Sequence, residues 1–122
     1  MTLRVGTDLT VVARVERLID TVGEAFLART WTAGERADSA GRAESLAARW
    51  AAKEAALKAL GAGVDEVPMT DIEVVAGPAL VLHGVASQRA EALGLREWVV
   101  SLSHDGGLAL AVVVATGDVI SS

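Results

Sequence analysis

The chain has 122 residues, of which 52% are hydrophobic, and its net charge is −5 at pH 7. This length fits one domain with a substantial core, while the acidic balance argues against nonspecific binding to nucleic acid. The sequence contains no cysteine, which excludes a disulfide framework and a thiolate metal site and fits a reducing cytoplasm.

Two further features of the whole chain bear on its location and partners. The first residues lack the basic and apolar pattern of a signal peptide, and the longest apolar run, 108–115, is too short to span a bilayer. We therefore expect a soluble cytoplasmic protein without membrane contact. Residues 1–60 hold nine basic and eight acidic side chains, whereas residues 61–122 hold two and eight, so the halves carry +1 and −6. An acidic partner is expected to dock on the first half.

The chain begins with a pattern that predicts a short strand followed by a helix. Residues 3–9 alternate as in a strand, with Gly6 allowing close approach of another backbone and Asp8 ending the strand. From 11 to 22 the apolar positions recur at helical spacing, with Thr10 or Asp8 as the candidate N-cap.

Further helical segments are expected before the middle of the chain. Gly23 ends the first helix, and a short helix is predicted over 24–29. Residues 32–44 are polar and rich in glycine and alanine, which indicates a mobile loop or a weak helix. A long helix then runs from about 45 to 60 and ends at the glycines of 61–63.

The second half is predicted to form two hairpins separated by one helix. The strands are expected at 71–75, 79–84, 97–104 and 108–115, and the helix at 85–93. The second hairpin turns at Asp105-Gly106-Gly107, since Asp-Gly is a strong hairpin signal. The element order predicts an α+β fold, a single domain over 1–122 in which an antiparallel sheet packs on the central long helix.

The long helix carries an unusual set of charges among small apolar side chains. Its alanines form one continuous arc that predicts a buried face: Ala51, Ala52, Ala55, Ala56 and Ala59. Glu54 and Lys58 share one edge of this arc, and Arg49 and Lys53 share the other. Glu54 and Lys58 form either an exposed i,i+4 ion pair without function, or a half-buried carboxylate that needs a cation beside it.

Several stretches occur together in an order that identifies a family. They are "VGTDLTVVARVERL", "RWAAKEAALKALGAG", "DIEVVAGPALVLHG" and "SLSHDGGLALAVVV". In this combination the chain strongly resembles the small bacterial holo-[acyl-carrier-protein] synthase family of 4′-phosphopantetheinyl transferases. The resemblance covers nearly the whole chain and is weakest between 32 and 45.

The resemblance implies a fold, an activity and an assembly. It implies the 4′-phosphopantetheinyl transferase fold and transfer of the phosphopantetheine arm of coenzyme A to a serine of an apo acyl carrier protein, releasing adenosine 3′,5′-bisphosphate. The nucleophile then belongs to the partner, which fits a chain without an obvious nucleophile of its own. The resemblance also implies a homotrimer with its sites at the subunit interfaces.

The resemblance implies a Mg²⁺ site made by Asp8 and Glu54. Mg²⁺ is normally held by one or two carboxylates together with substrate phosphates and water, so two acids suffice. Lys58, one turn beyond Glu54, matches a lysine that contacts coenzyme A phosphates. A helix cap is the rival role for Asp8, and a structural ion pair is an equally good role for Lys53.

The resemblance also implies catalytic and coenzyme A contacts beyond this trio. The residues expected beside coenzyme A are Arg49, Lys58, Gly61, Gly63, Pro78, Ser103 and His104. His104 and Asp105, taken alone, are explained equally well as a strand end and a turn. The general base stays open between a water on the metal, Glu54 and Asp105, with His104 better suited to a phosphate contact.

Carrier-protein recognition is expected on the first helices. The acidic helix of a carrier protein would meet Arg14, Arg17, Phe26 and Arg29. Acidic residues among these arginines indicate either weaker docking or a different carrier protein, for instance one of a polyketide or other secondary pathway, and the choice between fatty acid and secondary metabolism stays open. The alternative functions are a non-catalytic trimeric homologue that binds carrier protein or coenzyme A without transfer, and an unrelated acidic oligomerisation domain.

Overall fold

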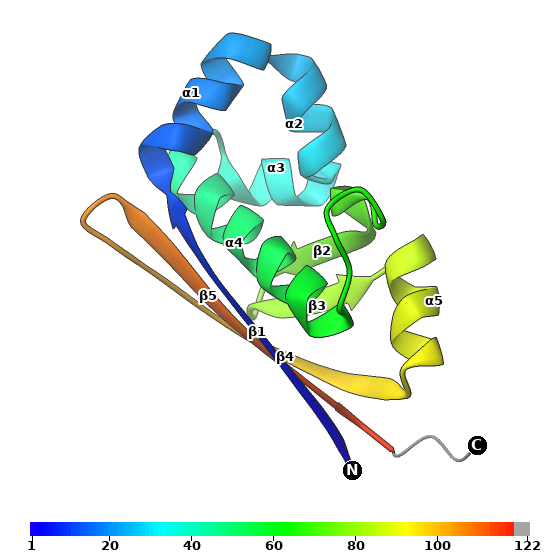
Figure 1. Cartoon of the computed structure of the whole chain (residues 1–122). Coiled ribbons are helices and arrows are strands. Elements are labelled where there is room, and N and C mark those ends of the chain that lie inside the picture. Colours follow the sequence, from blue (N-terminus) through cyan, green and yellow to red (C-terminus); the bar gives the residue numbers. More distant parts are fainter. Residues whose placement is uncertain (119–122) are drawn as a thin grey trace.

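The fold is α+β, and an antiparallel sheet packs on the long helix as predicted (Figure 1). The computed structural model describes residues 1–118, so residues 119–122 of the predicted domain lie outside the described part. No helix in the described part combines the length and the apolar composition needed to cross a membrane. The elements are β1 (Thr2–Val11), α1 (Val12–Val22), α2 (Glu24–Thr30), α3 (Ala33–Ser39), α4 (Ala43–Leu60), a 3₁₀ turn (Met69–Asp71), β2 (Ile72–Val75), β3 (Ala79–Leu82), α5 (Gly84–Ala92), β4 (Leu95–Asp105) and β5 (Leu108–Gly117).

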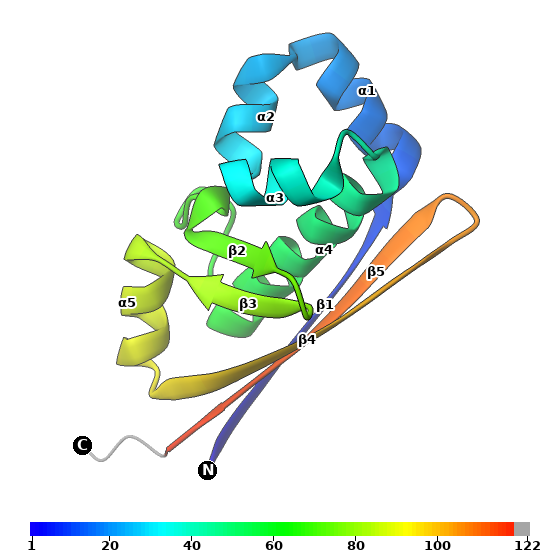
Figure 2. The same ribbon diagram turned by 180° about the vertical axis from the view of Figure 1, so that it is seen from behind.

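The main sheet has three strands in the order β1-β5-β4, so β1 and β4 are its two edges. The hairpin β2–β3 forms a separate two-stranded sheet. Figures 1 and 2 show α1, α2 and α3 gathered near one end of α4, and α5 with the hairpin nearer the other. In both views every helix lies on the same side of the main sheet.

Small residues let α4 lie very close to the sheet. The five alanines of the predicted arc are all fully buried, as are Ala109, Ala111 and Ala115 of β5. The backbones of β1 and α4 approach each other closely at Gly6, where a Cβ would lie only 1.7 Å from the carbonyl oxygen of Ala55. The predicted close backbone approach at Gly6 is therefore confirmed.

The start of α1 differs from the sequence prediction. Strand β1 does not end at Asp8 but continues to Val11, which pairs with Leu108 of β5. Val11 is the N-cap of α1 and makes no side-chain capping bond. Thr10 Oγ1 instead donates a 2.8 Å hydrogen bond to Asp8 Oδ2. Neither residue caps the helix, so the rival structural role of Asp8 is removed.

The segment predicted as a mobile loop or weak helix contains the helix α3. Thr32 and Glu35 form a complete capping box, in which each side chain accepts a bond from the other residue's backbone N–H. The T-x-x-E spacing that forms this box is readable in the sequence. Glu35 is also fully buried and pairs with Lys53, which fixes α3 against α4.

The face of the main sheet that points away from α4 is apolar and exposed. Antiparallel sheets with one solvated face usually place polar side chains there. Here the exposed positions alternate with the buried ones along the strands, and the large apolar side chains among them are Leu3, Val5, Leu9, Val11, Val99, Leu108 and Leu110. We call these residues the outer apolar face.

Candidate functional site

Three of the predicted site residues meet where the edge strand β1 passes beside α4. Asp8 points to the α4 side of the sheet, and Glu54 and Lys58 lie one turn apart on the helix. Lys58 Nζ lies 3.2 Å from Asp8 Oδ1 and donates a 2.8 Å hydrogen bond to the carbonyl oxygen of Thr7. Asp8 thus forms one cluster with an acid and a cation that lie about fifty positions later in the sequence.

The electrostatics of this cluster favour a cation beside Glu54. Burial raises the pKa of the half-buried Glu54 carboxyl, and the negative charge of Asp8 raises it further, while Lys58 opposes both effects. Lys58 makes its ion pair with Asp8 rather than with Glu54. The exposed i,i+4 pair is therefore not the arrangement found, and the half-buried carboxylate is.

The donor set suits a hard divalent ion that shares its coordination with a substrate. Asp8 and Glu54 supply two carboxylates, which is the number that Mg²⁺ usually takes from a protein when phosphates and water complete its shell. Within residues 1–118 no group of three or more His, Cys, Asp or Glu side chains is arranged to hold a metal. An ion at this edge would therefore take its remaining ligands from outside the protein.

A second group of predicted residues lies at the opposite edge of the sheet, along β4. A groove of about 810 Å³ runs between the start of α4 and this strand, and Arg42, Arg49 and His104 line it. His104 Nδ1 lies 3.5 Å from Glu44 Oε2. Arg49 also lines a neighbouring groove of about 510 Å³, together with Pro78 at the turn of the β2–β3 hairpin.

The two groups do not meet within one copy of the chain. Asp8 pairs with Ala111 of β5, and Ala111 pairs with Leu102 of β4, so two interstrand spacings, or about 10 Å, separate the edges. Helix α4 covers Ala111 and stands between the Asp8 and His104 side chains, which lie on the same face of the sheet. The structure therefore brings Asp8, Glu54 and Lys58 together and leaves Arg49, Pro78 and His104 apart from them.

Ser103 and Asp105 lie away from both groups. They are the neighbours of His104 on β4, one before it and one after it, and both are exposed. Their partners on β5, Leu110 and Leu108, belong to the outer apolar face. A role for either side chain in the groove with His104 therefore does not fit this structure, because successive side chains of a strand point to opposite faces.

The glycines after α4 form a braced loop beside Lys58. Gly61 ends the helix at φ 65°, and the N–H of Gly63 donates a 2.8 Å bond to Glu66. Arg89 donates to the carbonyl oxygens of Leu60 and Gly61, and Arg4 donates to that of Ala59. The roles of both arginines were not expected from the sequence. Arg4 is 55 positions from the carbonyl that it binds and Arg89 is 28 and 29 positions from its two, so no local pattern pairs them with the end of α4.

Comparison with known proteins decides the family. Residues 4–113 match the model of the 4′-phosphopantetheinyl transferase superfamily. The chain belongs to this superfamily.

Curated relatives agree with the family model. The chain is 46% identical to a holo-[acyl-carrier-protein] synthase of Herpetosiphon aurantiacus, over 92% of this chain and 97% of that protein. It is 48% identical to the holo-[acyl-carrier-protein] synthase of Chloroflexus aggregans, over 93% of this chain and 94% of that protein. A solved complex of such a synthase with coenzyme A, described as from Chronobacterium ammoniagenes, superposes with a TM-score of 0.82 at 29% identity, covering 97% of this chain and 99% of that one. The expected transferase fold is confirmed.

The expected carrier-protein face of this superfamily member carries exposed arginines on α1. Arg14 and Arg17 are exposed, and within residues 1–118 neither is paired with a carboxylate. Phe26, expected to contact the partner, is instead buried. Its ring packs edge to face against that of Trp31, with the two ring centroids 5.3 Å apart. Its ring cannot reach a partner here because it fills the core under α2. It supports Arg29, whose guanidinium lies 5.6 Å from the ring centroid.

One acidic residue of this face is neutralised. Arg36 of α3 makes two hydrogen bonds, of 2.8 and 3.0 Å, with the carboxylate of Glu24 at the start of α2. This contact with Arg36 lowers the pKa of Glu24. The face is therefore less acidic than the sequence alone suggests.

Lys53 is a structural residue of the transferase fold. Lys53 is fully buried. Its Nζ donates three hydrogen bonds, of 2.6 Å to Glu35 Oε1, of 3.0 Å to the Met69 carbonyl oxygen and of 2.5 Å to the Ile72 carbonyl oxygen. Desolvation lowers the pKa of Lys53, while Glu35 opposes this effect. The prediction of an ion-pair role is confirmed.

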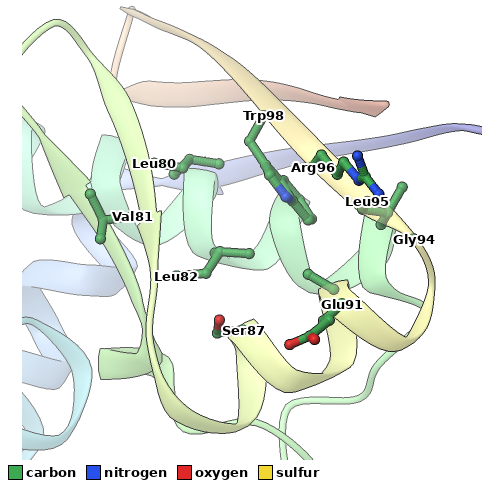
Figure 3. A pocket seen from close by; sticks show the side chains of 10 residues that line it. Leu80, Val81, Leu82, Ser87, Glu91, Gly94, Leu95, Arg96 and Trp98 are labelled. Carbon is green, nitrogen blue, oxygen red and sulfur yellow. The ribbon is translucent and has the colours of Figure 1, made fainter. Parts of the chain in front are cut away.

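A third cavity belongs to neither predicted group. It measures about 480 Å³ and lies between β3, α5 and β4. Figure 3 shows Trp98 reaching into it opposite Leu80 and Leu82, with Ser87 and Glu91 rising from α5. None of the predicted site residues lines this cavity.

Proposed function

We propose that the chain transfers the 4′-phosphopantetheine group of coenzyme A to a serine of an apo acyl carrier protein. The products are the holo carrier protein and adenosine 3′,5′-bisphosphate. The observation that carries this proposal is the meeting of Asp8, Glu54 and Lys58 at one edge of the sheet, in a chain whose relatives are named holo-[acyl-carrier-protein] synthase. We further propose that residues 1–122 form one such domain and that it acts in the cytoplasm, where coenzyme A is available.

Asp8 and Glu54 would hold the Mg²⁺ of this reaction. The ion supplies charge neutralisation at the diphosphate, which phosphoryl transfer needs more than covalent chemistry. Lys58 would contact the same diphosphate, and its position beside Asp8 with a 55% exposed side chain supports this role. The Gly61–Gly63 loop at the end of α4, which has no side chains of its own at these two glycines, would let coenzyme A approach the end of the helix.

The residues at the β4 edge would complete the site of a neighbouring copy. Because α4 stands between the two edges within one copy, we propose that Arg49, Pro78 and His104 act on coenzyme A held by the Asp8 of another subunit. Contact between two different surfaces of identical chains gives a ring when the rotation between neighbours closes, and an open filament when it does not. We propose the homotrimer as that ring, with the outer apolar face buried inside it.

The β4 edge would bind the 3′-phosphate of coenzyme A. The molecule carries only two phosphate groupings, and the diphosphate is assigned to the edge with Asp8. The Arg49 guanidinium and the His104 ring, which both carry N–H groups that can donate to a phosphate, line the groove that remains for the other phosphate.

The carrier protein would dock on α1 and α2. Arg14, Arg17 and Arg29 are exposed and fit the acidic helix of such a protein. The carrier protein would belong to fatty acid biosynthesis or to polyketide biosynthesis.

A mass measurement tests the proposed function. An apo carrier protein incubated with the chain, coenzyme A and Mg²⁺ should gain the mass of one phosphopantetheine. Asp8→Asn should abolish the gain, while Asp38→Asn, an exposed acid of α3, should leave it unchanged. A non-catalytic homologue would bind coenzyme A in calorimetry but load no carrier protein, and a chain that also fails to bind coenzyme A would exclude both functions.

A further inference from the structure

Arg49 is held on one side by a short chain of hydroxyl groups. Its Nη1 donates to Ser45 Oγ, one turn earlier on α4, and makes a longer contact of 3.5 Å with the Ser45 carbonyl oxygen. Ser45 Oγ in turn donates a 3.1 Å bond to Ser39 Oγ. Ser39 is fully buried at the end of α3. The orientation of the guanidinium is thus tied to the packing of α3 on α4.

The Ser45 hydroxyl is the side-chain group that orients Arg49. Among residues 1–118, the buried Nε of Arg49 has no hydrogen-bond partner. Buried donors are nearly always paired, so this one asks for an explanation. The guanidinium thus makes hydrogen bonds within the fold through Nη1, which binds Ser45, while its Nε is left without a partner. It is placed between two grooves, at the point where both of them reach its side chain.

The groove beside Arg49 has mixed charges, which makes orientation important. Arg42 adds positive charge, whereas Glu16 and Glu44 add negative charge to the same walls. A phosphate entering this groove gains little from net charge alone. It gains most from a guanidinium that presents a pair of N–H groups in the correct plane, since arginine recognises phosphate by paired bonds.

We propose that Ser45, backed by Ser39, is a positioning residue that aims Arg49 at the 3′-phosphate of coenzyme A. Ser45 does not take part in the reaction, and it acts on the ligand through Arg49. This inference rests on the proposed function, because it assumes that coenzyme A is the ligand. It assigns a role to a hydroxyl that none of the sequence motifs singled out.

Binding of two matched ligands tests the inference. Affinities for coenzyme A and for 3′-dephospho-coenzyme A are measured by calorimetry with Mg²⁺ present, for the wild type, Ser45→Ala, Ser45→Thr and Arg49→Ala. Ser45→Ala should weaken coenzyme A binding by roughly threefold to tenfold, the scale of one hydrogen bond, and leave 3′-dephospho-coenzyme A unchanged. Ser45→Thr keeps the hydroxyl and should restore the preference. Arg49→Ala should remove it.

The double variant separates action through Arg49 from direct contact. Adding Ser45→Ala to Arg49→Ala should cause no further loss of coenzyme A affinity. A further loss there, equal weakening of both ligands by Ser45→Ala, or no effect of Ser45→Ala would each overturn the inference. Melting temperatures show whether each variant is folded. A wild-type chain that binds neither ligand would instead contradict the proposed function, which keeps the two failures distinct.

Discussion

At the scale of single residues, the main feature is a pair of carboxylates that the fold holds together at a cost. Asp8 is only 16% exposed in its side chain, and Glu54 is half-buried beside it. Two negative charges in such surroundings destabilise the protein unless a cation joins them. Lys58 pairs with only one of them, so the site retains an affinity for a further positive charge.

The substitution Glu54→Gln should stabilise the protein while it removes activity. The pKa of Glu54 is higher in the folded state than in the unfolded chain, because burial and Asp8 disfavour the charged carboxylate. The charged carboxylate therefore lowers the free energy of unfolding at any pH above the folded pKa, and this destabilisation is relieved as the pH falls. Thermal melting at pH 7 without metal should therefore give a higher melting temperature for the variant. The difference should vanish at about pH 4, where the glutamate is largely protonated in both states.

The same variant should lose at least about 100-fold in transfer rate, since it removes a metal ligand. Glu44→Gln, at an exposed position of the same helix, controls for the loss of a charge from α4 in the melting experiment. A Glu54→Gln protein that melts at a lower temperature than the wild type would contradict the electrostatic description of the site.

At the scale of elements, the site depends on how closely α4 approaches β1 and how firmly it is held. Gly6 sets the distance, and the buried pair of Lys53 and Glu35 ties α4 to α3 and β2. Glu35 also accepts a 2.9 Å bond from the Val74 N–H. These contacts place Glu54 and Lys58 opposite Asp8, and none of them touches the proposed substrates.

Gly6→Ala should push the helix away from the strand. The added Cβ would lie 1.7 Å from a backbone oxygen, so the backbone itself must shift. Overpacking of this kind costs about 1–3 kcal/mol, and urea denaturation should show a loss in this range or above. Transfer activity of the fraction that stays folded should fall as well, because Asp8 and Glu54 move apart. Full activity in a folded Gly6→Ala protein would show that this spacing does not matter.

Lys53→Met should destabilise the protein by about 3–5 kcal/mol, because it leaves the Glu35 carboxylate buried without its partner. Adding Glu35→Gln removes the unpaired charge and retains an amide oxygen as acceptor, so much of the loss should be recovered. Urea denaturation of both variants checks this. If the double variant is as unstable as the single one, the buried charge is not the cause.

The sequence predicts these elements unevenly, for physical reasons. The alanine arc, the glycine contact and the hairpins follow from local periodicity and turn chemistry, and the motifs name Asp8 and Glu54 through family resemblance. Helix α3 was predicted only as one of two alternatives, a mobile loop or a weak helix, because its composition is weak for a helix and the tertiary burial of Glu35 stabilises it. The contacts of Arg4 and Arg89 with the end of α4 span long stretches of sequence, so no local pattern reveals them.

At the scale of the whole molecule, one copy presents two incomplete halves of a site and a bare apolar sheet face. The half with Asp8 lies at the β1 edge, and the half with Arg49 lies at the β4 edge. Leu3, Val5 and Leu9 are each more than half exposed on the side of the sheet that no helix covers. Association of copies accounts for both features at once, since it would bury this face and join unlike edges.

Complementation between two inactive variants tests this account most directly. The substitution Asp8→Asn removes a metal ligand from the β1 half only, and Arg49→Ala removes a phosphate contact from the β4 half only. Each variant protein should therefore be inactive or nearly inactive by itself. When both are co-expressed with different tags and purified as mixed assemblies, sites that combine the two intact halves should form. In a trimeric ring every mixed assembly contains one site with both halves intact, so its transfer rate should recover to roughly a third of the wild-type rate. Mixed assemblies no more active than either variant alone would contradict a site shared between subunits.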